Sequence, residues 1–179
     1  MTVEELFIGC RKGKALHQKT LVERYSSMLF SVAKRYTGNE YDAQDIVQDA
    51  LVKILKGLKN NYKERGKPEQ WMRTITINTA LNAMDRSWVS RETDFENMPD
   101  VPGDYPDAIA ELGAEELMEL VASLPDGYRQ IFNLAVIENF SHAEIAERLD
   151  IVESTSRSQL LRARKILQMK VREQEKIRI

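Results

Sequence analysis

The chain has 179 residues, of which 42% are hydrophobic and 30% charged, and its formal net charge is −2. That length accommodates one or two small domains. The acidic balance excludes a protein that coats nucleic acid through bulk electrostatics, because phosphate neutralisation supplies the affinity of such proteins. Any contact with DNA must therefore be local. Few glycines and prolines, with many good helix formers, predict an all-α fold.

Several classes of protein are disfavoured by what the sequence lacks. Cys10 is the single cysteine, so no internal disulfide forms and a structural zinc is not expected. His17 and His142 match no metal spacing, and there is no phosphate-binding glycine loop and no serine elbow. We therefore expect no catalytic residues, no metal and no cofactor. The acidic N-terminus and the lack of a long apolar run predict a cytoplasmic protein without membrane insertion.

Two helices are predicted in the first 40 residues. Thr2 and Glu5 have the spacing of a capping box, which opens a helix that ends near residues 12–13. A second apolar stripe, from about Ala15 to Tyr36, ends at Gly38.

The next predicted helix, from Tyr41 to Leu58, has one strongly apolar face. A second face carries acidic and amide side chains, namely Asp42, Asp45, Gln48 and Asp49. Such a run is by default a solvated helix face. The functional alternative is a docking surface for a basic partner.

Basic and aromatic residues follow this helix. The polar segment 60–70 is predicted to be a loop and contributes Tyr62, Lys63 and Arg65. A helix from about residue 68 to Trp88 then carries a stripe of Trp71, Asn78 and Asn82. Aromatic faces stack bases, amides bind base edges and basic groups follow phosphates, so this region suits single-stranded nucleic acid. That Trp71 belongs to the core is an equally good interpretation.

Residues 92–111 contain seven acids, no base and three of the five prolines, a composition typical of a flexible linker. We therefore predict a first helical domain at residues 1–90, a linker at 91–111 and a second helical domain at 112–179.

The second domain has the pattern of a helix-turn-helix. Pro125 suits the first turn of a helix whose stripe includes Tyr128, Ile131, Phe132, Ala135 and Val136. Ser141 and Glu144 form a capping box for the next helix. The turn falls at residues 149–151, where Asp150 tolerates the positive φ that the turn needs.

The last helix is predicted to be basic on its outer side. Residues 154–172 contain six basic side chains and no acidic one, while Leu160, Ala163, Ile166 and Leu167 form the inward stripe. Arginine can donate twice to a guanine edge, and Leu161 can contact a thymine methyl. A solvated basic helix is the alternative interpretation. The preceding capped helix makes DNA binding the favoured one.

The order of these features resembles bacterial RNA polymerase sigma factors of the extracytoplasmic-function group. The resemblance rests on YDAQDIVQDALVKIL, WMRTITINTALNAMDR and the segment from LPDGYRQIF to LLRARKIL, and it extends from about residue 6 to 170. The chain departs from the family pattern at Asp150, Val152 and Ser156.

The resemblance implies a role for each group of residues. Docking to the polymerase beta-prime coiled coil would use Asp42, Asp45, Gln48 and Asp49. Capture of the melted minus-10 strand would use Tyr62, Lys63, Arg65, Trp71, Asn78 and Asn82. Recognition of the minus-35 duplex would use Thr155, Arg157, Ser158, Gln159, Leu161, Arg162 and Lys165.

The implied partners are core RNA polymerase, through its beta-prime coiled coil and beta flap, promoter DNA and an anti-sigma factor. The rival hypothesis is a stand-alone dimeric helix-turn-helix regulator, which would bind paired half-sites without polymerase. A helical adaptor or a nucleic-acid-modifying enzyme is disfavoured because catalytic groups are missing.

Overall fold

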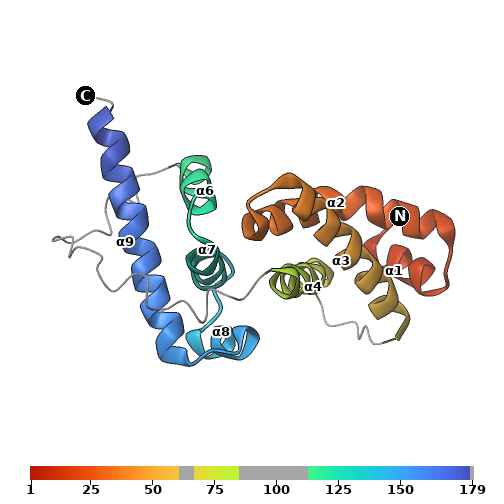
Figure 1. The fold of residues 1–179 in the computed structure, drawn as a ribbon. Helices are drawn as coiled ribbons and strands as arrows, with labels where there is room; N and C mark the ends of the chain where they lie inside the picture. Colours follow the sequence, from red (N-terminus) through yellow and green to blue (C-terminus); the bar gives the residue numbers. More distant parts are fainter. Residues whose placement is uncertain (61–66, 85–112, 178–179) are drawn as a thin grey trace. The chain divides into compact units, whose positions relative to one another are not determined.

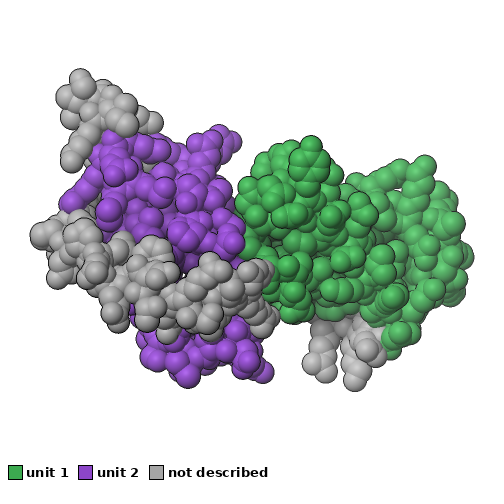
Figure 2. All heavy atoms as spheres, viewed as in Figure 1, with its two compact units in different colours: residues 1–84 green, residues 85–179 purple. Residues whose placement is uncertain are grey.

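A computed structural model describes residues 1–60, 67–84 and 113–177. The chain forms two compact units, residues 1–84 and residues 85–179 (Figure 2). Every regular element in the described residues is a helix, which confirms the all-α prediction. None of the described helices is long and apolar enough to cross a membrane.

The first unit is built from four helices (Figure 1). They are α1 (Val3–Arg11), α2 (Ala15–Thr37), α3 (Glu40–Asn60) and α4 (Pro68–Ala83). Helices α2, α3 and α4 pack against one another, and α1 packs against α2 and α3. The shared core includes Leu6, Leu21, Leu29, Ile54, Met72 and Ile77, each at most 2% exposed.

The helix ends of this unit follow from local chemistry. The predicted capping box is present, since the Glu5 backbone N–H donates to Thr2 Oγ1 at 3.1 Å and the Thr2 N–H donates to Glu5 Oε2 at 2.8 Å. Hydrogen bonding from Thr2, first from its backbone N–H, lowers the pKa of the Glu5 carboxyl. Gly38 has a φ of 75°, the left-handed conformation that ends α2 as predicted.

Helix α4 is shorter than the sequence predicts. The prediction extended it to Trp88, but it ends at Ala83, because Met84 adopts an extended conformation with a ψ of 144°. The apolar spacing of Ile77, Leu81 and Met84 continues past the point where the backbone leaves the helix. The helical prediction is therefore wrong at Met84, and Trp88 lies outside the described residues.

In the second unit, shorter helices pack against one side of a long helix. The elements of this unit are α6 (Ala114–Ala122), α7 (Asp126–Phe132), η2 (Asn133–Ile137), α8 (His142–Leu149) and α9 (Glu153–Ile177). Helices α6, α7 and α8 all contact α9 (Figure 1). Pro125 precedes α7 as its N-cap residue rather than lying within its first turn.

A π-helical turn alters the apolar stripe predicted after Pro125. Tyr128, Ile131 and Phe132 are buried as predicted, but Val136 is 40% exposed. The wider turn of η2 shifts the register, so that Leu134 becomes fully buried in place of the later positions. The 3.6-residue period used for the prediction does not apply across such a turn.

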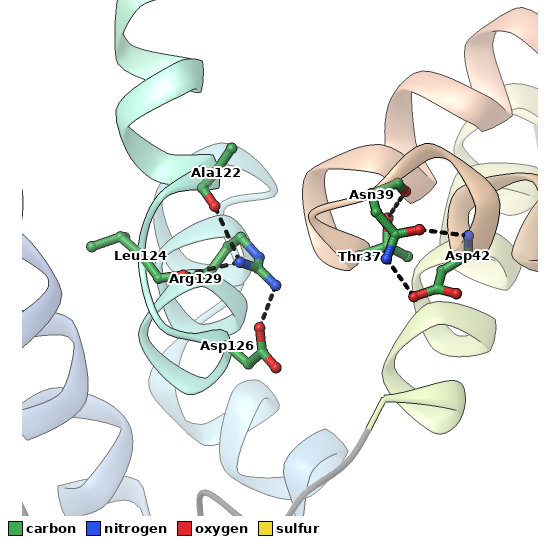
Figure 3. A network of polar contacts seen from close by, with 7 residues as sticks. All are labelled: Thr37, Asn39, Asp42, Ala122, Leu124, Asp126 and Arg129. Carbon is green, nitrogen blue, oxygen red and sulfur yellow. Dashed lines mark hydrogen bonds and ion pairs between the residues drawn. The ribbon is translucent and has the colours of Figure 1, made fainter.

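A buried arginine joins α6 to α7 (Figure 3). The Arg129 Nη1 donates to the carbonyl oxygens of Ala122, at 3.2 Å, and Leu124, at 2.9 Å, while Nη2 pairs with Asp126 Oδ1 at 2.5 Å. Arg129 is only 5% exposed. It therefore satisfies carbonyl groups at the junction that water cannot reach freely.

The turn between α8 and α9 has the predicted geometry. Asp150 adopts φ 54° and ψ 50°, and the Ile151 N–H donates to the Ala146 carbonyl at 3.1 Å. The left-handed conformation costs an ordinary side chain about 1–2 kcal/mol. Aspartate tolerates it better than most residues, which explains why this turn forms without glycine.

Replacing Asp150 with valine should lower the free energy of unfolding of the second unit by about 1–2 kcal/mol, because a β-branched residue is strained at positive φ. Asp150→Gly should not lower it, since glycine adopts this conformation without strain. Urea unfolding of the full chain, followed by far-ultraviolet circular dichroism, measures both. Equal stability of the two variants would contradict the strain argument.

Candidate nucleic-acid and docking surfaces

The outer face of α3 carries the predicted docking residues. Asp45, Gln48 and Asp49 are all exposed, and we call them the α3 ridge. Tyr41, 83% exposed, and Val52, 49% exposed, lie on the same side of the helix as Asp45 and Gln48 at helical spacing. Within the described part of the chain, neither carboxylate of the ridge forms an ion pair. The ridge thus combines open negative charge with exposed apolar surface.

Asp42, the fourth predicted docking residue, has a structural role at the start of α3 (Figure 3). Its backbone N–H donates to Asn39 Oδ1 at 2.9 Å, and its carboxylate accepts from Asn39 Nδ2 at 2.6 Å. Thr37 Oγ1 donates to the Asn39 carbonyl at 2.9 Å. Asp42 is exposed, but its side chain is already engaged in this cap.

Helix α4 presents the predicted stripe of Trp71, Asn78 and Asn82. Both asparagines are exposed, whereas Trp71 is half-buried. Its indole lies against Gly57 of α3, where a β-carbon would come within 2.9 Å of Trp71 Cζ2. The packing and stacking interpretations of Trp71 are therefore compatible, because one part of the ring contacts α3 and another part remains accessible. Tyr62, Lys63 and Arg65 lie outside the described residues.

A second contact crosses between α3 and α4. Lys53 Nζ donates to Thr79 Oγ1 at 3.1 Å, and the Thr79 hydroxyl also donates to the Ile75 carbonyl at 2.8 Å. Thr79 is 3% exposed. Together with the Gly57 contact, this bond fixes α4 against α3 beneath the exposed asparagines.

Most of the predicted minus-35 residues lie on the outer side of α9. Arg157, Ser158 and Leu161 are exposed, the leucine by 57%. Thr155 and Lys165 are half-buried. On the opposite side Leu160, Ala163 and Leu167 are buried, as predicted, and Ile166 is half-buried.

Gln159 does not lie on the outer face. It is 4% exposed, so the prediction that places it on the groove side or the flank is wrong. Gln159 precedes the buried Leu160, and its position at helical spacing from Ser156 and Ala163 places it on the inward side of α9. Because glutamine is polar, the sequence alone did not indicate that this position is buried. We remove Gln159 from the group of candidate DNA contacts.

Arg162 lies at the boundary between the outer face and the core. Burial raises the pKa of Tyr128, and the guanidinium of Arg162, which is hydrogen-bonded to it, opposes that rise. Tyr128 comes from α7 and is 4% exposed. A buried hydroxyl on a neighbouring helix thus helps to orient a side chain predicted to contact bases. The sequence identified Tyr128 only as a core residue.

The capping box at Ser141 defines the start of α8. Ser141 donates from its backbone N–H and its hydroxyl to Glu144 Oε2, both at 2.8 Å, and these bonds lower the pKa of Glu144.

In the ranges described by the structure, no cluster of three or more potential ligands could hold a metal ion. The described surfaces include an acidic face on α3 in the first unit and a basic face on α9 in the second.

Both units match models of one protein family. Residues 21–89 match sigma-70 region 2, and residues 114–167 match sigma-70 region 4. The chain belongs to the sigma-70 family. A stand-alone regulator is not favoured, because a helix-turn-helix alone would not account for the region 2 match.

Named relatives agree with this assignment. The extracytoplasmic-function RNA polymerase sigma factor SigE of Mycolicibacterium smegmatis is 29% identical, over 82% of this chain and 58% of that protein. The sigma-E factor of Escherichia coli is 28% identical, over 96% of this chain and 95% of that protein. The chain thus spans little more than half of the mycobacterial relative but nearly all of the Escherichia coli one.

A solved structure has a similar fold. It is the sigma factor RpoE from Bartonella quintana, crystallised with the anti-sigma factor NepR. The match has a TM-score of 0.50 and 22% sequence identity, and it covers 84% of this chain and 94% of that chain. This likeness concerns the fold alone.

The contact between Gly57 and Trp71 gives a prediction for the first unit. In Gly57→Ala the new methyl group meets the indole, so Trp71 should move away from α3 and become more accessible to acrylamide. Alanine favours the helical conformation by about 1 kcal/mol over glycine, so the displacement of Trp71 would not come from a weaker α3. Fluorescence quenching in a Trp88→Phe background isolates Trp71, since the chain has two tryptophans. Val52→Ala, on the outer side of α3, is the control, and equal quenching in the two variants would contradict the contact.

Proposed function

We propose that this sigma factor binds core RNA polymerase through the α3 ridge and directs initiation at promoters that it recognises through both units. The observation that carries the proposal is the separation of charge. Asp45 and Asp49 on α3 form no ion pair with the described residues, and the outer face of α9 is basic. The first face suits a basic protein partner, and the second suits phosphate and base edges.

The polymerase contact would be made by the beta-prime coiled coil. Asp45 and Asp49 supply charge that no described side chain neutralises, and Gln48 supplies a donor and an acceptor between them. Tyr41 and Val52 extend the surface with apolar area, which is what a docking interface needs at its centre. The beta flap would engage the second unit.

The DNA contacts would divide between the units. We assign minus-10 capture to the first domain, residues 1–90, with Trp71, Asn78 and Asn82 on α4 and Tyr62, Lys63 and Arg65 in the preceding segment. We assign minus-35 recognition to residues 112–179, through Thr155, Arg157, Ser158, Leu161, Arg162 and Lys165. Residues 91–111 would connect the two. The exposed amides of Asn78 and Asn82 and the half-buried Trp71 support the first assignment, and the exposed Arg157 supports the second.

The chain would have no catalytic activity of its own, because RNA synthesis belongs to the polymerase, and it would act in the cytoplasm where that enzyme is found. An anti-sigma factor is a further partner that we propose. The support is that the Bartonella quintana sigma factor was crystallised with one.

Reversing both acids of the ridge, in Asp45→Lys with Asp49→Lys, should abolish co-purification with core polymerase while the fold is unchanged. Both residues are exposed, so the fold does not depend on them, whereas like charges at an interface cost several kcal/mol. A pull-down with purified core enzyme measures the loss. Glu4→Lys with Glu23→Lys makes the same change in net charge on α1 and α2 and should leave binding intact. Retained binding by the α3 variant would refute the docking assignment.

Arg162→Ala should relax base preference within the minus-35 element, because a bidentate arginine contact is worth about 1–3 kcal/mol of discrimination. Arg164→Ala is the matched control, because the proposal gives the exposed Arg164 no base contact. Loss of an arginine that contacts only phosphate would weaken binding to all sequences alike. Transcription by the holoenzyme from a library with a randomised minus-35 element separates the two. An unchanged preference in Arg162→Ala would exclude Arg162 from base recognition.

A further inference from the structure

A side-chain hydrogen bond connects the two helices of the helix-turn-helix. His142 Nδ1 lies 2.9 Å from Ser156 Oγ. His142 is the first residue of α8, and Ser156 lies in the first turns of α9. Ser156 is fully buried and His142 is half-buried. The bond is thus largely shielded from water, where a hydrogen bond is stronger than it is on the surface.

The position of this bond relative to the turn gives it a geometric role. The turn at Asp150 already attaches the last residue of α8 to the start of α9. His142 lies at the opposite end of α8, about 10 Å away for a helix of this length. The packing of buried residues of α8 against α9 already limits the angle between the two helices. A directional hydrogen bond far from the turn adds a second fixed point and limits that angle further.

The start of α9 has no side-chain cap that could fix it instead. Val152 stands immediately before the helix and has no acceptor in its side chain. The Thr155 and Ser156 backbone N–H groups donate to the Val152 carbonyl, at 3.0 and 3.3 Å. These bonds hold the turn together but do not anchor it to the rest of the unit. Ser156 provides an anchor through its hydroxyl.

We propose that His142 is a positioning residue for minus-35 recognition, holding Ser156 so that the neighbouring Arg157 and Ser158 meet the correct base pairs. The inference rests on the proposed function, because it concerns how the same basic face acts. Arg157 and Ser158 follow Ser156 directly and are exposed. Any shift of Ser156 moves both of them, and contacts to base edges tolerate displacements of only about 0.5 Å.

The chemistry of the pair defines the variants that test it. The Ser156 hydroxyl can donate to an unprotonated Nδ1 or accept from a protonated one, so the bond needs a polar atom at the Nδ1 position. Asparagine places its amide near that position, whereas alanine leaves the buried hydroxyl without this partner. His142→Asn is therefore the conservative replacement. Ser154→Ala, an exposed serine in the same region of α9, is the matched control.

The experiment uses the full chain with core polymerase on a library with a randomised minus-35 element. The base pairs read by the start of α9 are first identified with Arg157→Ala. At those positions His142→Ala and Ser156→Ala should each reduce the preference for the best base by about three- to tenfold, the range expected for one lost hydrogen bond. His142→Asn should stay within about twofold of the parent, and Ser154→Ala should match it.

The measured base preference distinguishes a positioning role of His142 from a purely structural one. A partly unfolded protein would lose activity on every promoter alike and would keep its preference among sequences. Unchanged preferences in His142→Ala and Ser156→Ala would overturn the inference. So would a loss in His142→Asn as large as that in His142→Ala. If the parent protein itself shows no minus-35 preference, the proposed function fails along with the inference. If the parent shows one and the variants keep it, only the inference fails.

Discussion

The second unit depends on how the apolar side of α9 packs. Leu160, Ala163 and Leu167 are buried against the shorter helices, and this burial holds in place a helix whose opposite side carries repelling positive charges. Ala163, fully buried, allows close approach of the neighbouring helices. Because α6, α7 and α8 all contact α9, their positions and the orientation of its basic face are determined together. The bonds at Arg129 and Asp150 refine this packing and would have no fixed frame without it.

In the first unit, a helix is likewise held by burial of one apolar face, but its exposed side is acidic. Helix α3 buries one complete face, from Ala43 to Leu58, and leaves its acids exposed. With a net charge of −2, the chain is not expected to bind DNA through bulk electrostatics, so the proposed DNA contact is confined to its local basic face. Asp45 and Asp49 form no ion pair with the residues that the structure describes, and such a surface is suited to a basic partner. The two faces thus support a single account in which docking and recognition occur in different units.

Much of this arrangement could be predicted from the sequence, because it follows from local rules. Capping boxes at Thr2 and Ser141 and the stripe of α3 depend on neighbours within one helix, and the structure confirms them. The π-helical turn could not be predicted, because an apolar period of 3.6 residues describes an α-helix and not the wider π-helical turn. The burial of Gln159 and the roles of Tyr128 and Gly57 depend on which helices meet, and no spacing within one helix contains that information. Gly57 alone gave a signal, as a glycine inside a helical pattern often marks close packing.

The central claim is that this chain gives promoter specificity to a polymerase and does not act as a repressor or activator by itself. Run-off transcription on a library of genomic promoters, with purified core polymerase and the full chain, tests it most directly. The account predicts transcripts from a defined subset of promoters that require both components, with weak binding of the chain alone to the same duplexes. Tight binding of the chain alone to paired half-sites, with no new transcripts when core polymerase is added, would contradict it.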